Sequence, residues 1–171
     1  MILIAIGANL PGPDGSPPLK ICEAAAEAIR AIPGLSFVAQ STWYRSRAVP
    51  ASSQPDYCNG MIRMRGDLSP TDLLHELQKI EARFGRERSV PNAARTLDLD
   101  IIDMAGTIRA TPDPVLPHPR AHQRAFVLRP LLDVNPAWRH PVLRQNVTTL
   151  LAELPPQEIE PWHEEPELPG K

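Results

Sequence analysis

Two aspartates in the middle of the chain, Asp98 and Asp100, have the spacing that points most directly to chemistry. They alternate with Leu97, Leu99 and Ile101, a pattern typical of a strand with one apolar and one acidic face. On such a strand both carboxylates project to the same side, about 7 Å apart. Mg²⁺ suits this pair, because it takes one or two carboxylates and completes its coordination with water or phosphate. A solvated sheet edge whose aspartates pair with arginines is the alternative, and spacing alone leaves both open.

Basic side chains flank this strand on both sides in the sequence. If the loop before it folds back over the acidic strand, guanidinium groups and a metal converge, and such an arrangement is typical of phosphoryl transfer. The chain has no GxxxxGKS or GxxxxGKT motif, so a nucleotide must be held by arginine and metal rather than by a P-loop. The basic residues concerned are Arg86, Arg88, Arg95, His118, Arg120 and Arg124.

Two further polar features allow a functional and a structural interpretation. His118 and His122 are four residues apart, but Pro119 lies between them and disfavours a shared helix face for zinc. Glu81 falls near the end of a predicted helix, where its charge meets the unfavourable end of the helix dipole. Either an arginine of the following loop neutralises Glu81, or Glu81 orients a ligand.

Alternating and helical patterns predict the elements that must position these residues. A helix is predicted from Ser16, as cap with Pro17 at its first position, to Gly34, and a second from the cap Ser69 to Gly85. The order of strands and helices predicts an α+β fold, a two-layer ferredoxin-like sandwich with a mainly antiparallel sheet and long active-site loops. Strands are predicted over residues 1–6, 35–44, 57–65 and 96–104, and short helices over 126–132 and 147–151.

Composition separates a body from a tail. The chain has 171 residues, and 153–171 contain five of its 21 prolines, six glutamates and one lysine. We therefore expect one domain over residues 1–152 and an acidic, proline-rich, mostly unstructured tail over 153–171. The body has 17 basic and 14 acidic residues, a balance that favours an anionic small ligand or simply a solvated basic surface.

The two cysteines and the N-terminal residues indicate the cellular compartment in which the protein is expected. Cys22 and Cys58 form neither a CxxC pair nor a disulfide framework, which indicates a reducing compartment. The apolar run at residues 1–6 is too short for a signal peptide or a membrane span. We expect a cytoplasmic protein.

Seven short segments resemble the family of 6-hydroxymethyl-7,8-dihydropterin pyrophosphokinases of folate biosynthesis. The RTLDLDI and LPHPR segments, in this order and spacing, are the most specific, and the resemblance covers about residues 1–151. The segments are IGANL (6–10), YRS (44–46), QPDYCN (54–59), EARFGR (81–86), RTLDLDI (95–101), LPHPR (116–120) and RAFVL (124–128).

The resemblance implies an enzyme that moves the pyrophosphoryl group of ATP onto the pterin hydroxymethyl oxygen and releases AMP. It implies two Mg²⁺ ions held by Asp98 and Asp100, with Arg86 and Arg95 joining these two in catalysis. It also implies that the protein acts on ATP and dihydropterin. The chain has no long basic stripe interleaved with aromatic residues, so we expect a monomer that binds neither nucleic acid nor membrane. The implied nucleotide-binding residues are Glu81, Arg86, Arg88, Arg95, Ile101, His118 and Arg124, and the implied pterin-binding residues are Ser46, Val49, Tyr57, Asn59 and Phe126.

The loop over residues 91–94 departs from the family pattern. It reads PNAA, whereas the family commonly has Gly-Pro, often with an aromatic residue just before it, ahead of the Arg-Thr pair. In the family this loop closes over the substrates, and the aromatic residue stacks on the pterin. A protein that binds both substrates without turning them over is therefore the second hypothesis.

Overall fold

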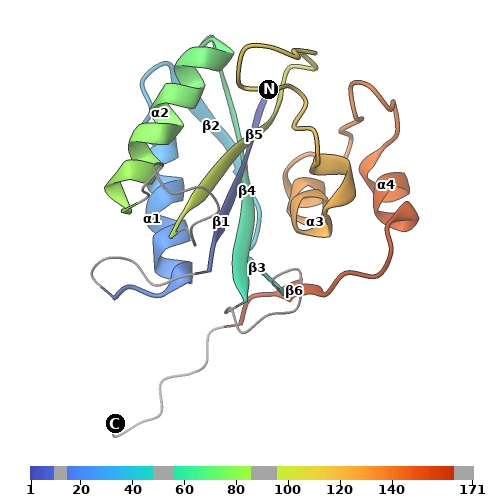
Figure 1. The fold of residues 1–171 in the computed structure, drawn as a ribbon, viewed down its shortest axis with the longest axis horizontal. Coiled ribbons are helices and arrows are strands. Elements are labelled where there is room, and N and C mark those ends of the chain that lie inside the picture. Colours follow the sequence, from blue (N-terminus) through green and yellow to red (C-terminus); the bar gives the residue numbers. More distant parts are fainter. Residues whose placement is uncertain (10–14, 48–55, 86–95, 164–171) are drawn as a thin grey trace, which may run out of the picture.

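The computed structural model describes residues 1–9, 15–47, 56–85 and 96–163, which form one mixed α and β structure (Figure 1). A short 3₁₀ turn at Ala121–Gln123 precedes the third helix. The elements are β1 (Ile2–Ala8), α1 (Pro18–Arg30), β2 (Leu35–Gln40), β3 (Tyr44–Ser46), β4 (Tyr57–Gly66), α2 (Pro70–Arg83), β5 (Asp98–Met104), α3 (Ala125–Val134), α4 (Val147–Glu153) and β6 (Ile159–Pro161).

The sheet has the strand order β5-β1-β4-β3-β6, with β2 pairing β4 beside β3. Every pair of strands is antiparallel, which confirms the predicted mainly antiparallel α+β fold. The central β1 is apolar on both faces, because both of its faces are covered. The helices α1 and α2 cover one face, and α3 and α4 add a layer on the other (Figure 1).

The predicted strand 35–44 is divided into β2 and β3. The break begins at Ser41. Its N–H still donates to the carbonyl of Met61 at 2.9 Å, but the N–H of Met61 donates at 2.8 Å to the Ser41 hydroxyl. Trp43 then packs on Gly60, where an added Cβ would lie 2.4 Å from the indole ring. Because this contact joins residues far apart in the chain, the local pattern of apolar residues could not reveal it.

The helix starts show one confirmed cap and one wrong one. Ser69 caps α2 as predicted, since its hydroxyl accepts the N–H of Asp72 at 3.1 Å. Ser16 is not the cap residue of α1: that residue is Pro17, whose side chain makes no capping hydrogen bond. Pro18 disfavours helical backbone angles in the residue before it, and Pro17 is accordingly extended at ψ 157°, so the helix begins one residue later.

The C-terminal segment is more ordered than the sequence suggests. Ile159–Pro161 forms β6 and pairs with β3, so the prediction of a mostly unstructured tail is wrong for these residues. Residues 164–171 lie outside the described residues. Among the helices that are described, none has the length and apolar character needed to cross a membrane.

Candidate active site

The acidic edge of the sheet is built by β5, the last strand in the sheet order. Leu99 and Ile101 point into the core beneath α1 and α2, so Asp98 and Asp100 project from the opposite face, as the alternation predicts. Asp100 keeps about half of its side chain exposed. Two carboxylates on one face of an edge strand therefore stand within reach of a ligand.

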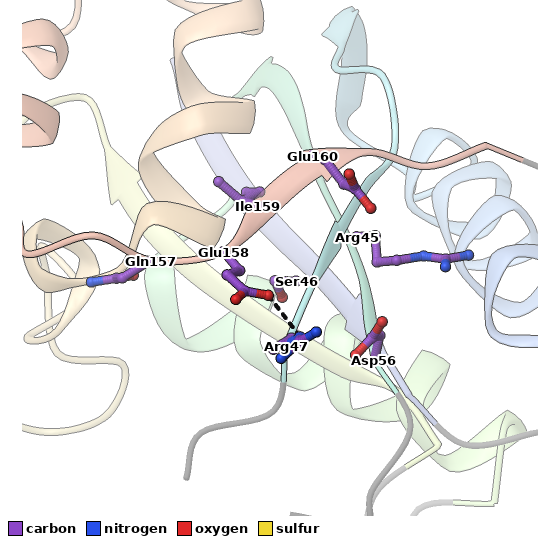
Figure 2. Close-up of a pocket in the computed structure, with 8 residues that line it drawn as sticks. All are labelled: Arg45, Ser46, Arg47, Asp56, Gln157, Glu158, Ile159 and Glu160. Atoms are coloured by element: carbon purple, nitrogen blue, oxygen red, sulfur yellow. Dashed lines mark ion pairs between the residues drawn. The ribbon is translucent and has the colours of Figure 1, made fainter. Parts of the chain in front are cut away.

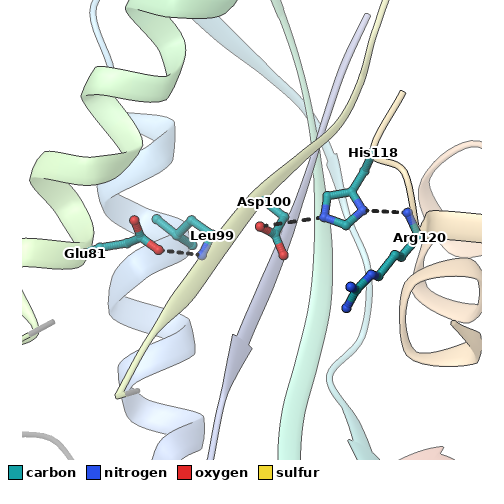
Figure 3. Close-up of polar contacts among 5 residues, drawn as sticks. All are labelled: Glu81, Leu99, Asp100, His118 and Arg120. Carbon is teal, nitrogen blue, oxygen red and sulfur yellow. Dashed lines mark hydrogen bonds and ion pairs between the residues drawn. The ribbon is translucent and has the colours of Figure 1, made fainter. Parts of the chain in front are cut away.

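Glu81 ties this strand to α2. Its carboxylate is only 2% exposed and accepts the backbone N–H of Leu99 at 3.1 Å, between the two aspartates (Figure 3). Neither interpretation of Glu81 from the sequence included this bond. It fixes the backbone that carries both aspartates to the last turn of α2.

His118 lies on the other side of Asp100 (Figure 3). Its Nε2 is 4.0 Å from Asp100 Oδ1, and its Nδ1 accepts the backbone N–H of Arg120 at 3.2 Å. Burial lowers the pKa of His118, the charges of Arg124 and Arg120 lower it further, and Asp100 opposes them. The imidazole is therefore neutral at pH 7, with its proton on Nε2, where it can be donated to an anion.

A cavity of about 300 Å³ opens beside Asp100 and His118. Ile101 also lines it, so two residues that the resemblance assigns to nucleotide binding, Ile101 and His118, meet here beside the predicted metal ligand Asp100. The helix side of the cavity comes from Leu74 and Gln78, which the sequence analysis missed. Their i, i+4, i+7 spacing with Glu81 on α2 is the signal that could have found them.

A second cavity, of about 630 Å³, brings together four predicted residues from distant parts of the chain. Ser46 and Tyr57 face each other across the β3–β4 pair, and Arg124 and Phe126 come from the start of α3. Residues 156–159 of the C-terminal segment form much of the remaining wall, and the sequence did not predict any of them. The full lining is Ser46, Arg47, Tyr57, Gln123, Arg124, Ala125, Phe126, Pro156, Gln157, Glu158 and Ile159.

Asn59 lies behind this cavity rather than along it. The side chain is buried, and its Nδ2 donates to Ser46 Oγ at 2.6 Å. Because Ser46 lines the cavity, Asn59 acts on the cavity wall through this hydroxyl. Arg86, Arg88, Arg95 and Val49 lie outside the described residues, so their roles stay predictions.

The acidic edge fits Mg²⁺ better than it fits a structural metal. Within the described parts of the chain, no three His, Cys, Asp or Glu side chains gather to hold a metal. Two neighbouring carboxylates are the usual protein share of a Mg²⁺ site whose other ligands are water and substrate phosphate. A structural zinc site would need four protein ligands around the metal, which is more than these two carboxylates provide.

Comparison with known proteins agrees with this geometry. The sequence model of the 7,8-dihydro-6-hydroxymethylpterin-pyrophosphokinase family matches residues 3–136. A 2-amino-4-hydroxy-6-hydroxymethyldihydropteridine pyrophosphokinase of Pseudomonas aeruginosa is 36% identical over 159 residues, covering 93% of this chain and 94% of the relative. The Synechocystis protein of the same name is 34% identical over 152 residues, covering 89% of this chain and 75% of its own.

Solved structures agree in fold. The HPPK-DHPS protein of Plasmodium falciparum superposes with a TM-score of 0.65 at 13% identity over 89% of this chain. The present chain covers 44% of that longer protein. The names of its relatives place this chain in the class of phosphoryl-transfer enzymes. The chain belongs to the 7,8-dihydro-6-hydroxymethylpterin-pyrophosphokinase family, and is thus an enzyme that transfers pyrophosphate in folate biosynthesis.

Proposed function

We propose that this chain transfers the pyrophosphoryl group of ATP to the hydroxymethyl oxygen of 6-hydroxymethyl-7,8-dihydropterin. The hydroxyl oxygen attacks the β-phosphorus, the bond from that phosphorus to the α,β-bridging oxygen breaks, and AMP leaves while the hydroxyl proton is released. The observation that carries the proposal is the acidic edge beside His118, with one cavity at Asp100 and a second at Phe126. Arg124 lines the second cavity, and its charge also acts on His118.

The nucleotide fits the cavity beside Asp100. Its apolar walls, Leu74 and Ile101, suit the base and ribose, and Gln78 can offer a polar contact. The neutral His118 can donate its Nε2 proton to a phosphate oxygen at the open end. Arg86, Arg95 and Arg124 complete the proposed phosphate contacts, with Arg86 and Arg95 acting in catalysis. Arg88 and Glu81 would lie along the nucleotide.

Asp98 and Asp100 would hold the magnesium ions, which we propose to be two. Bound Mg²⁺ neutralises triphosphate charge that builds up as the group is transferred. The contribution of the chain is to fix the two carboxylates, and the bond from Glu81 to Leu99 does this between them. Loss of one carboxylate should therefore affect the reaction far more than it affects the fold.

The pterin fits the second cavity. A flat heterocycle needs an apolar slot with a few polar groups, and Phe126 and Tyr57 provide aromatic surface while Ser46 provides a hydroxyl. Asn59 orients that hydroxyl, and Val49 belongs to the same proposed set. We also propose that the protein is a cytoplasmic monomer and does not bind nucleic acid.

Replacement of Asp100 by Asn tests the proposal. We expect kcat for AMP formation to fall about 100-fold or more, because a charged ligand of an essential cation is lost. Asp67→Asn is the matched control, since Asp67 is exposed in the loop before α2. Near-normal turnover of Asp100→Asn would contradict the role of the acidic edge. Substrate binding without AMP formation by the wild type would instead favour a binding protein.

A further inference from the structure

The C-terminal strap, residues 154–162, returns along the far edge of the sheet after α4 (Figure 1). Ser46 pairs with Ile159 and Tyr44 pairs with Pro161, and the N–H of Trp162 donates to the carbonyl of Trp43 at 2.8 Å. The strap lies beyond residues 3–136, the part that the family model matches.

The strap forms one wall of the larger cavity. Residues 156–159 line it together with Tyr57 and Phe126. Figure 2 shows the adjoining hollow, of about 590 Å³, where Glu158 Oε2 lies 2.7 Å from Arg47 Nε. Both of these side chains are about two-thirds exposed, so the ion pair adds little stability and mainly registers the strap against β3.

Gln157 connects the strap to the start of α3. Its Oε1 accepts the backbone N–H of Ala125 at 2.8 Å, and its Nε2 donates to the carbonyl of Gln123 at 3.1 Å. Ala125 is the first residue of α3, and the side chain of the cap residue Arg124 makes no capping bond. Since a helix start leaves its first N–H groups without partners, Gln157 supplies from a distance the acceptor that the helix lacks.

The residues on either side of Ala125 are Arg124 and Phe126, which both line the larger cavity. We propose that Gln157 is a positioning residue of the pterin site, an inference that rests on the proposed function. Its amide fixes the backbone from Gln123 to Ala125, and so sets where the Phe126 ring stands against the strap. If the strap only protected the edge of the sheet, replacing Gln157 would lower the stability of the protein and leave its affinity for the pterin unchanged.

Gln157→Ala removes both hydrogen bonds, and Gln157→Glu keeps an acceptor for the N–H of Ala125. Gln145→Ala is the matched control, because Gln145 lies in the loop before α4 and lines neither cavity. Calorimetry would titrate 6-hydroxymethyl-7,8-dihydropterin into each full-length protein with Mg²⁺ and α,β-methylene-ATP. This analogue has no bridging oxygen to release, so binding is measured without reaction. The analogue is also titrated alone, and melting temperatures are recorded.

We expect Gln157→Ala to raise the Kd for the pterin about tenfold, and the Kd for the analogue less than threefold, because the strap does not line the cavity at Asp100. Gln145→Ala should stay within about twofold of the wild type, and Gln157→Glu, which keeps the bond from Ala125 but loses the bond to Gln123, should have a smaller loss than Gln157→Ala. An unchanged Kd in Gln157→Ala, or an equal loss in Gln157→Glu, overturns the inference. So does an equal loss for both ligands with a lowered melting temperature, which would indicate a general structural role. A wild-type protein that binds no pterin overturns the proposed function as well, so the two failures are distinguishable.

Discussion

Glu81→Ala is the substitution whose effect follows most directly from the structure. The carboxylate is buried and accepts the N–H of Leu99, on the outer side of the last strand of the sheet. Alanine removes a charged acceptor and leaves a buried N–H without it, which costs about 2–3 kcal/mol of unfolding free energy. Glu81→Gln keeps an amide oxygen for the same bond and should cost about 1 kcal/mol.

The same substitution should slow turnover, because Leu99 lies between the two aspartates. A backbone freed at this point displaces Asp98 and Asp100, and a misplacement of about 1 Å can cost about 100-fold in rate. Urea denaturation gives the unfolding free energy, and AMP formation gives kcat. Glu76→Ala is the control on the same helix, since Glu76 pairs with Lys79 at 3.1 Å on the exposed side of α2. Glu81→Ala with the stability and kcat of Glu76→Ala would refute the reasoning.

Three further predictions concern the core, the pterin pocket and pH. Asp103 is buried and accepts the indole N–H of Trp138 at 2.8 Å. Asp103→Ala should therefore lower the unfolding free energy, measured by urea denaturation, by about 2–3 kcal/mol. A loss of less than about 1 kcal/mol would count against this role. Asn59→Ala removes the hydrogen bond to Ser46. In steady-state assays KM for the pterin should rise about tenfold while KM for ATP stays unchanged. Equal changes in both KM values would contradict the placement of the pterin in the cavity that Ser46 lines. Burial and the neighbouring His122 lower the pKa of His140, whose Nδ1 also accepts two backbone N–H groups, from Val142 and Leu143. As the pH falls, His140 is protonated in the unfolded chain near pH 6.5, before it is protonated in the folded protein. The unfolding free energy should therefore decrease as the pH drops below about 6.5. An NMR titration that gives His140 of the folded protein a pKa above about 6.5 would exclude His140 as the cause.

Local signals made much of the site predictable. The alternation around Asp98 and Asp100 is a two-residue pattern, and the strand indeed directs both carboxylates away from the core. The start of α2 at Ser69 and its end before Gly85, which has a φ of 84°, are equally local, because a cap and a left-handed glycine act within a few residues.

The features that escaped prediction depend on contacts between distant residues. The division of β2 from β3 depends on Gly60 accommodating Trp43, and the wall made by the strap depends on its pairing with β3. Gln157 reads as a polar tail residue in the sequence, and only the fold brings it to Ala125. The bond between the N–H of Leu99 and Glu81 likewise joins two elements, α2 and β5, so neither element alone could indicate it.

The measurement that tests the central claim most directly is the identity of both products when wild-type protein, ATP, Mg²⁺ and 6-hydroxymethyl-7,8-dihydropterin are combined. We expect mass spectrometry to find AMP and the pterin diphosphate in equal amounts, and neither when pterin or Mg²⁺ is omitted. ADP with a pterin monophosphate, or AMP formed without pterin, would contradict pyrophosphoryl transfer at this site.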